Sequence, residues 1–455
     1  MTSQYITTTD GTRIAIDLYL PTDSTCASPR ACILTQTRYF RSISLRWPWR
    51  LLANQGRPFS FLHTRYYEGM LGAGYAVVAM DIRGTGASFG TVLHPWLVNQ
   101  MTHVLERQDS VDVIDWITRQ PWSNGRVGLW GMSYEATAAY LTVSTHHPAI
   151  KACVPMYMFY DMYNDIASPG MMILLQTVVV IGPWNHSGVQ FYNPVTQIHQ
   201  RSACDHVNRV VSFFRHHLND DVTACSAATF TGAIEYFTLG DNTWRVATSW
   251  PPPHTTRRDF FLSMNDRALV TDVRAIQPGS CTWNVECQRD LGGVSRWQAT
   301  IDVYEPMQYH GWHAANHVVF TSLPFDHSVT VQYYLCLQGQ CRAAHAPQDG
   351  AGGSMSRQSS PTYLDLVPHN PDPDVPRHSF YERDRRPIPA CTKVTFGLLP
   401  IAFQAPRKAR LQVRICGHDA KHFTQVDPTR TMELTADATA CVSSLSLPIL
   451  EAPPL

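Results

Sequence analysis

The sequence lacks an excess of charge of either sign. Its 455 residues hold 36 lysines and arginines and 36 aspartates and glutamates, so the formal net charge at pH 7 is zero. Binding to a nucleic acid depends on Lys and Arg side chains that neutralise phosphates, and such proteins carry a basic surface. The balanced charge therefore argues against a nucleic acid partner and favours a small-molecule or peptide substrate.

A long hydrophobic run is lacking as well. The longest apolar stretch, residues 171–181, contains Gln176 and Thr177 and is much shorter than the roughly 20 residues that cross a bilayer. The first residues, MTSQYITTTDGTRIAID, have neither the basic start nor the apolar core of a secretion signal. We therefore expect a cytoplasmic protein without a membrane partner, in which residues 171–181 form a buried strand.

The twelve cysteines include no CxxC pair, the spacing typical of zinc sites and thioredoxin-like centres. Cytosolic thiols stay reduced, so we interpret these cysteines as structural. His310, His313 and His317 have the spacing of metal ligands on a helix, but their surroundings are β-rich and include Gly311. Loop histidines are the favoured interpretation, and the sequence implies no metal and no cofactor.

The first half of the chain alternates between strand and helix patterns. Residues 4–21 form two alternating runs joined at Asp10-Gly11, a hairpin signal. Continuous apolar runs at 31–37 and 75–81 predict buried strands, residues 105–118 predict an amphipathic helix, and residues 126–130 predict the next strand. This alternation predicts a mostly parallel α/β sheet through about residue 200.

The second half has a different pattern. Three consecutive prolines within residues 243–256 indicate a linker. Short β-type runs divided by turn residues follow, and residues 342–376, rich in Pro, Gly, Ser and Gln, predict a long loop. We predict two domains, a mostly parallel α/β domain at 1–253 and a β-sandwich or jelly roll at 254–455.

Ser133 is the candidate nucleophile. The stretch GLWGMSYEATAAY, residues 128–140, predicts an apolar strand that runs into a helix of small residues, with Ser133 at the turn. Such a turn exposes the serine Oγ and directs the next backbone N–H toward a developing oxyanion. Gly131 provides the small residue before the serine, whereas Glu135 stands where the common motif has glycine. Taken alone, the motif is weak, and an ordinary helix N-cap serine is the alternative interpretation.

Several further motifs occur in one order: DIRGTGASFG at 81–90, the acidic helix at 106–117, QPWSNGRVGLWGMSY at 120–134 and IGPWNH at 181–186. Together they closely resemble the CocE/NonD family of serine hydrolases, the α/β-hydrolases of the cocaine-esterase and X-prolyl dipeptidyl-peptidase type. The resemblance resumes at 235–250, 318–324 and 398–423. The family's serine motif is similar to G-x-S-Y-x-G, so its last glycine corresponds to Ala136, and Glu135 occupies a variable position.

The resemblance implies a role for each motif residue. Ser133 corresponds to the nucleophile and His186 to the general base that takes its proton. The family's oxyanion hole is built from a tyrosine hydroxyl after the third strand and from the N–H that follows the serine. Tyr39 and Tyr134 occupy these two positions.

The acid of the triad is the weak point. Between Ser133 and His186 the carboxylates are Glu135, Asp161 and Asp165. The helical cap of the family and the acid loop that follows it have no counterpart, so we expect a shortened or missing cap and a shallow, open site. A truncated gene model or splice form would explain this. Asp161 and Asp165 follow a predicted strand at 152–155 and are the candidate acids.

The sequence thus predicts a serine hydrolase that cleaves an ester or amide, with an X-prolyl dipeptidyl-peptidase among the activities of the family. The alternative is a catalytically impaired homologue that serves binding or assembly, because loss of the triad acid costs about 10⁴-fold in turnover. The presence of a carboxylate next to His186 would separate the two. The sequence does not indicate an oligomeric state.

Overall fold

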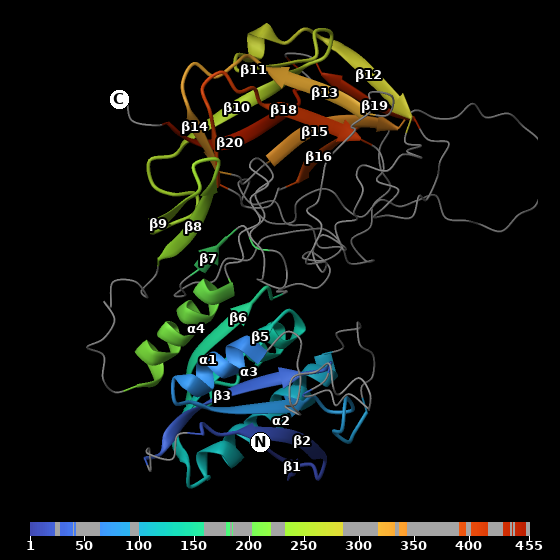
Figure 1. Cartoon of the computed structure of the whole chain (residues 1–455). Coiled ribbons are helices and arrows are strands. Elements are labelled where there is room, and N and C mark those ends of the chain that lie inside the picture. Colours follow the sequence, from blue (N-terminus) through green and yellow to red (C-terminus); the bar gives the residue numbers. More distant parts are fainter. Residues whose placement is uncertain are drawn as a thin grey trace, which may run out of the picture. The chain divides into compact units, whose positions relative to one another are not determined.

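The structure is a computed structural model that describes residues 1–22, 28–39, 41, 64–91, 100–158, 179–182, 184, 203–219, 233–284, 317–332, 336–343, 391–396, 402–416, 431–436, 439 and 442–451. The chain divides into two compact units (Figure 1). Unit 1 comprises residues 1–162, 184–191 and 200–230, and unit 2 comprises residues 163–183, 192–199 and 231–455.

Unit 1 contains a six-stranded mixed sheet in the order β1-β2-β4-β3-β5-β6. The strands are β1 (Thr2–Thr7), β2 (Arg13–Tyr19), β3 (Arg30–Thr37), β4 (Ala76–Asp81), β5 (Ser123–Met132) and β6 (Ile150–Met156). The predicted hairpin at Asp10-Gly11 is confirmed, since β1 and β2 pair antiparallel, and Gly11 has φ 85°. β2 is antiparallel to β4, whereas β4, β3, β5 and β6 are mutually parallel, as the strand–helix alternation predicted.

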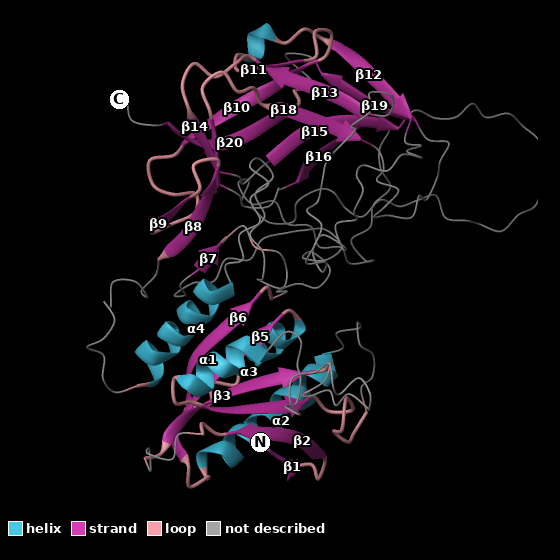
Figure 2. Ribbon diagram, in the orientation of Figure 1, coloured by secondary structure: helices cyan, strands magenta, loops and turns pink. Residues whose placement is uncertain are grey.

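Helices cover both faces of this sheet (Figure 2). α1 (Thr64–Gly72) and α4 (Ala203–Leu218) pack on one face, and α2 (Gln100–Thr118) and α3 (Tyr134–Val143) pack on the other. Successive side chains of β3 point to opposite faces. Ile33 lies in the cluster that contains Met70 and Phe214, and Leu34 lies in the cluster that contains Ile114. This period of two explains why the central strands are continuously apolar.

Unit 2 contains a sheet of fourteen strands. They are β7 (Val179–Ile181), β8 (Ile234–Leu239), β9 (Thr243–Ala247), β10 (Thr256–Ser263), β11 (Ala268–Val270), β12 (Gly279–Asn284), β13 (His317–Ser322), β14 (Val329–Gln332), β15 (Cys336–Ala343), β16 (Cys391–Phe396), β17 (Ala402–Ala405), β18 (Gln412–Cys416), β19 (Thr431–Ala436) and β20 (Ser444–Glu451). Within the described residues, one 3₁₀ turn (Val273–Ala275) is the remaining regular element of this unit. The prediction of a β-rich second half is confirmed, and its arrangement as a jelly roll stays a prediction.

The units and the predicted domains differ at residues 163–183, 192–199 and 231–253. The last of these segments contains β8 and β9. The contacts of β8 and β9 place this segment in unit 2, because β8 pairs with β7 and β17 in parallel and with β9 antiparallel. The division at residue 253 stays a prediction. Residues 342 and 343, expected in a loop, belong to β15, and residues 344–376 lie outside the described residues, as do 171–178 of the expected strand before β7.

Two absences apply to the described part of the chain. No helix in it combines the length and apolar character of a membrane span. Nor does it contain a group of three or more His, Cys, Asp or Glu side chains that could hold a metal ion. His310 and His313 lie outside the described residues, and His317 is the first residue of β13.

Candidate active site

Ser133 occupies a tight turn between β5 and α3. Its φ of 59° and ψ of −123° lie in a region that costs a non-glycine residue about 1–3 kcal/mol. The Ser133 N–H donates to the Met156 carbonyl oxygen at 2.9 Å, which fixes the turn against the end of β6. The Ser133 side chain makes no capping hydrogen bond to α3. Ser133 thus stands at the N-cap position of α3 without capping the helix through its side chain, and the strained turn matches the predicted nucleophile elbow.

Gly131 allows β5 and α3 to approach closely at this turn. A Cβ on Gly131 would lie 2.5 Å from the carbonyl oxygen and 2.7 Å from the Cβ of Glu135. On the other side of the serine, Ala136 is fully buried. Gly131 and Ala136 are thus the small residues on the two sides of Ser133, and Glu135 is accommodated because Gly131 leaves room for its backbone and Cβ.

We expect Gly131→Ala to lower the free energy of unfolding by about 1–3 kcal/mol, because the added methyl group meets backbone atoms that cannot rotate away. Urea denaturation followed by circular dichroism measures the effect. Gly72→Ala is the matched control, since a Cβ there meets no atom within 4 Å. Equal unfolding midpoints for wild type and Gly131→Ala would contradict the close approach.

The structure brings Tyr39 to Ser133. Tyr39 follows the end of β3, where its N–H donates to Thr37 Oγ1 at 3.1 Å. Partial burial raises the pKa of the Tyr39 phenol, and a hydrogen bond with the Ser133 side chain opposes this rise. The two residues are 94 positions apart (133 − 39), so the fold, rather than the local sequence, produces this contact. A phenol beside the serine hydroxyl is suitably placed to donate to an oxyanion.

Tyr134 is the first residue of α3, where a backbone N–H is not used within the helix. Its phenol donates to Glu106 Oε2 of α2 at 2.9 Å. The Arg38 guanidinium carbon lies 3.9 Å from the centroid of the Tyr134 ring. Burial raises the pKa of Glu106, while the hydrogen bond from Tyr134 and the positive charge of Arg38 oppose the rise.

The sequence reasoning did not single out Glu106 or Arg38. Arg38 directly precedes Tyr39, and Glu106 is the first carboxylate of the acidic helix motif. The position of Arg38 next to Tyr39, a predicted oxyanion-hole residue, was the one sequence signal that pointed to it. For Glu106 no local signal existed, because its partner Tyr134 is 28 positions away.

The glycine-rich motif at 81–90 forms a loop around the carboxylate of Asp81, its first residue. The Asp81 carboxylate accepts from the Ala87 N–H at 2.8 Å and from Arg41 Nε at 2.8 Å. Gly86 has φ 54°, and a Cβ there would stand 2.5 Å from Asp81 Cγ. The glycine thus serves a tight loop around a carboxylate, and the motif has a structural role.

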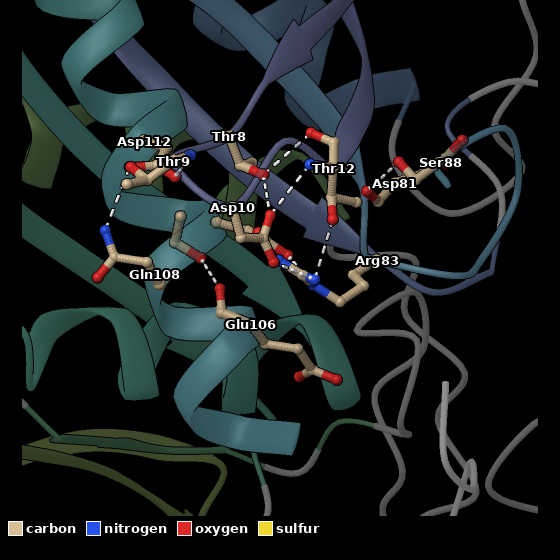
Figure 3. Close-up of polar contacts among 12 residues, drawn as sticks. Thr8, Thr9, Asp10, Thr12, Asp81, Arg83, Ser88, Glu106, Gln108 and Asp112 are labelled. Atoms are coloured by element: carbon tan, nitrogen blue, oxygen red, sulfur yellow. Dashed lines mark hydrogen bonds and ion pairs between the residues drawn. The ribbon is translucent and has the colours of Figure 1, made fainter. Parts of the chain in front are cut away.

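Arg83 connects this loop to the hairpin and to α2 (Figure 3). It donates to both carboxylate oxygens of Asp109, from Nε at 2.8 Å and from Nη2 at 2.5 Å. Its Nη1 donates to Asp10 Oδ2 at 2.7 Å and to Thr12 Oγ1 at 3.1 Å. The hydrogen bond from Arg83 is the main reason why the pKa of Asp10 lies well below its usual range.

His186 and both candidate acids, Asp161 and Asp165, lie outside the described residues. Trp184, two positions before His186, belongs to unit 1 together with Ser133. Its ring meets that of His206 of α4 edge-on, with centroids 3.9 Å apart. His206 is buried, and its Nδ1 lies 3.3 Å from the Tyr66 hydroxyl oxygen. Trp184 is thus packed against a helix of the unit that contains Ser133.

Comparisons with known proteins agree with this geometry. Residues 10–181 match the family described as X-Pro dipeptidyl-peptidase (S15 family). A Mycobacterium bovis protein named as a serine esterase is 25% identical, with 92% of this chain and 91% of that protein aligned. The cocaine esterase of a Rhodococcus species is 29% identical over 155 residues, which are 34% of this chain and 23% of that enzyme.

Solved structures show the fold. A CocE/NonD family hydrolase from Staphylococcus aureus superimposes with a TM-score of 0.66 at 14% identity, covering 99% of this chain and 93% of that one. An α-amino acid ester hydrolase superimposes with a TM-score of 0.64, also at 14% identity, covering 98% and 96%. The chain therefore has the α/β-hydrolase type of fold found in these hydrolases.

The alignment with the mycobacterial relative extends over 599 positions, and this chain has 455 residues, so at least 144 positions (599 − 455) hold no residue of this chain. The relative thus contains sequence without a counterpart in this chain. The shortened or missing cap stays a prediction.

Proposed function

We propose that this chain, a member of the CocE/NonD family of serine hydrolases, cleaves an ester or amide bond through an acyl-enzyme on Ser133. The observation that carries the proposal is the strained strand-to-helix turn that presents Ser133 beside the Tyr39 hydroxyl. Backbone strain at a serine between a strand and a helix is the arrangement expected of a nucleophile elbow.

In the proposed reaction, Ser133 Oγ attacks the substrate carbonyl carbon while His186 takes the serine proton. The carbonyl oxygen becomes an oxyanion that accepts hydrogen bonds from the Tyr39 hydroxyl and the Tyr134 N–H. Collapse of this intermediate breaks the ester or amide bond, and the leaving group takes the proton from His186. Water then attacks the acyl-enzyme and gives a proton to His186, which passes it to Ser133 Oγ as the ester bond to the serine breaks and the carboxylic acid leaves.

His186 enters this proposal through the resemblance. Either Asp161 or Asp165 is proposed to orient the imidazole. The catalytically impaired alternative is not favoured, because the relatives compared here are named as an esterase or another hydrolase.

The substrate is proposed to be a small ester, amide or peptide. The test is covalent labelling by a fluorophosphonate probe, followed by mass spectrometry of the peptide that spans residues 128–140. The expected result is a single adduct on Ser133 in the folded protein, prevented by prior urea denaturation, together with hydrolysis of a p-nitrophenyl ester. Absence of an adduct on Ser133 in folded protein would contradict the proposal.

Tyr39→Phe is expected to lower kcat by about 10²–10³-fold for ester hydrolysis, because one of two oxyanion donors is removed. KM is expected to change little, since the hydrogen bond strengthens as the oxyanion forms. Steady-state kinetics with a p-nitrophenyl ester measure both constants. The matched control is Tyr5→Phe, because Tyr5 is also 47% exposed but lies on β1. An unchanged kcat in Tyr39→Phe would remove Tyr39 from the oxyanion hole.

A further inference from the structure

The two proposed oxyanion donors come from different parts of the fold and are held by shared neighbours. Tyr39 follows β3, and Tyr134 begins α3. A hydrogen-bond donor contributes to catalysis only if it is already oriented when the oxyanion forms, and a misplacement of about 1 Å can cost 10²-fold. The residues that fix these two donors are therefore candidates for positioning residues.

Glu106 holds Tyr134 from α2. Its Oε2 accepts the Tyr134 phenol proton at 2.9 Å, so the first residue of α3 is tied to a helix that packs on the same face of the sheet. This bond fixes the side chain of the residue whose backbone N–H is proposed to face the oxyanion. Hydrogen bonds to a carboxylate are stronger than those between neutral groups.

Arg38 connects the Tyr134 side chain to Tyr39. Its guanidinium carbon lies 3.9 Å from the Tyr134 ring centroid, well within the range of a cation–π contact. Arg38 is also the residue before Tyr39, so the contact restrains the backbone that carries the second donor. Its positive charge acts on Glu106 as well. Arg38, Tyr134 and Glu106 thus form one assembly, which we call the oxyanion clamp.

We propose that the oxyanion clamp positions the two donors, with Glu106 and Arg38 acting through Tyr134 rather than on the substrate. This inference rests on the proposed function, in which the Tyr39 hydroxyl and the Tyr134 N–H stabilise the oxyanion. A merely structural role would predict a loss of stability on disrupting the clamp, with an unchanged rate in the molecules that remain folded.

The test measures the rate at which a fluorophosphonate forms its bond to Ser133, as the first-order constant k_inact and the apparent affinity K_I. The variants are Tyr134→Phe, Glu106→Leu, their double variant, Glu106→Gln and Arg38→Met. Gln108→Ala is the control, because Gln108 is exposed on the same helix and donates to Asp112. Urea unfolding midpoints establish that each variant is folded.

We expect Tyr134→Phe and Glu106→Leu each to lower k_inact by about 10-fold with K_I unchanged, because a displaced donor affects the transition state alone. The double variant is expected to react no more slowly than either single variant, since both remove the same hydrogen bond. Glu106→Gln keeps an acceptor and is expected to retain a k_inact within about threefold of wild type. Arg38→Met is expected to lower k_inact by a smaller factor.

Two different results would overturn the oxyanion clamp, and the labelling of wild-type protein distinguishes them. If wild-type protein forms the adduct on Ser133 but folded Tyr134→Phe reacts at the wild-type rate, the clamp is wrong and the proposed function stands. If folded wild-type protein forms no adduct on Ser133, the proposed function fails and the clamp with it. Should Glu106→Leu not fold, Tyr134→Phe, which removes one hydroxyl, decides the matter.

Discussion

Ser133→Ala is expected to lower kcat for ester hydrolysis by about 10⁴–10⁶-fold, the loss found when a serine nucleophile is removed. The methyl group cannot form the acyl bond, while the turn, with its φ of 59°, is still held by the Ser133 N–H bond to Met156. Binding of substrate is expected to persist. Turnover of a p-nitrophenyl ester measures the loss of kcat, and fluorophosphonate labelling measures the loss of the reactive hydroxyl.

The control is a serine at the opposite end of the same helix. Ser144→Ala alters an exposed hydroxyl that bonds the Leu141 carbonyl and is expected to leave activity unchanged. His186→Ala is expected to reduce kcat by a factor similar to that of Ser133→Ala, and the double variant to be no worse than either, because nucleophile and base act as one unit. Residual activity near the wild-type value in Ser133→Ala would show that another group performs the reaction.

Arg83→Met is expected to destabilise the protein by about 3–5 kcal/mol, the effect of leaving one member of a buried ion pair without its partner. The Asp109 side chain is 1% exposed and accepts two hydrogen bonds from Arg83, so its carboxylate would remain buried without the guanidinium. The same substitution removes the bond to Asp10 in the hairpin. Urea denaturation at pH 7 measures the change in the free energy of unfolding.

The matched control is Arg274→Met, since Arg274 forms an ion pair with Asp272 at the surface, where such pairs contribute little. The double variant Arg83→Met, Asp109→Leu is expected to recover much of the loss, because the buried charge is removed together with its partner. A loss in the double variant equal to or larger than that in Arg83→Met would contradict the unpaired-charge explanation.

The deficit of Arg83→Met is also expected to depend on pH. Arg83 holds the pKa of Asp10 below its unfolded value, so this stabilisation is complete above about pH 4 and is lost as the pH falls toward the folded value. Burial raises the pKa of Asp109, and without Arg83 this carboxyl takes up a proton more readily. Both effects make the difference between wild type and variant shrink in acid. A difference that grows below pH 4 would contradict this assignment.

Local sequence was sufficient for much of unit 1. The hairpin at Asp10-Gly11, the buried strands β3 and β4 and the elbow at Ser133 follow from patterns within about ten residues, because turn chemistry and side-chain periodicity are local properties. The family resemblance added Tyr39, whose pKa is influenced by Ser133 although 94 positions separate the two residues. The resemblance also explained how Glu135 can follow Ser133 by two positions. In the structure, Gly131 lies against the Glu135 backbone and leaves room for it.

Other features depend on contacts between residues that are distant in the chain. In the sequence, Arg83 and Asp109 belong to two separate motifs. Only the fold shows that these residues, 26 positions apart, form an ion pair that joins the two motifs. The same holds for Tyr134 with Glu106 and for Arg38 with Tyr134. By itself the sequence determined many of the elements and the strand-to-helix turn at Ser133, because these rest on local geometry. The tertiary structure decided which charged and aromatic side chains orient the site, because burial and pairing are set by the packing of α2 and α3 on the sheet.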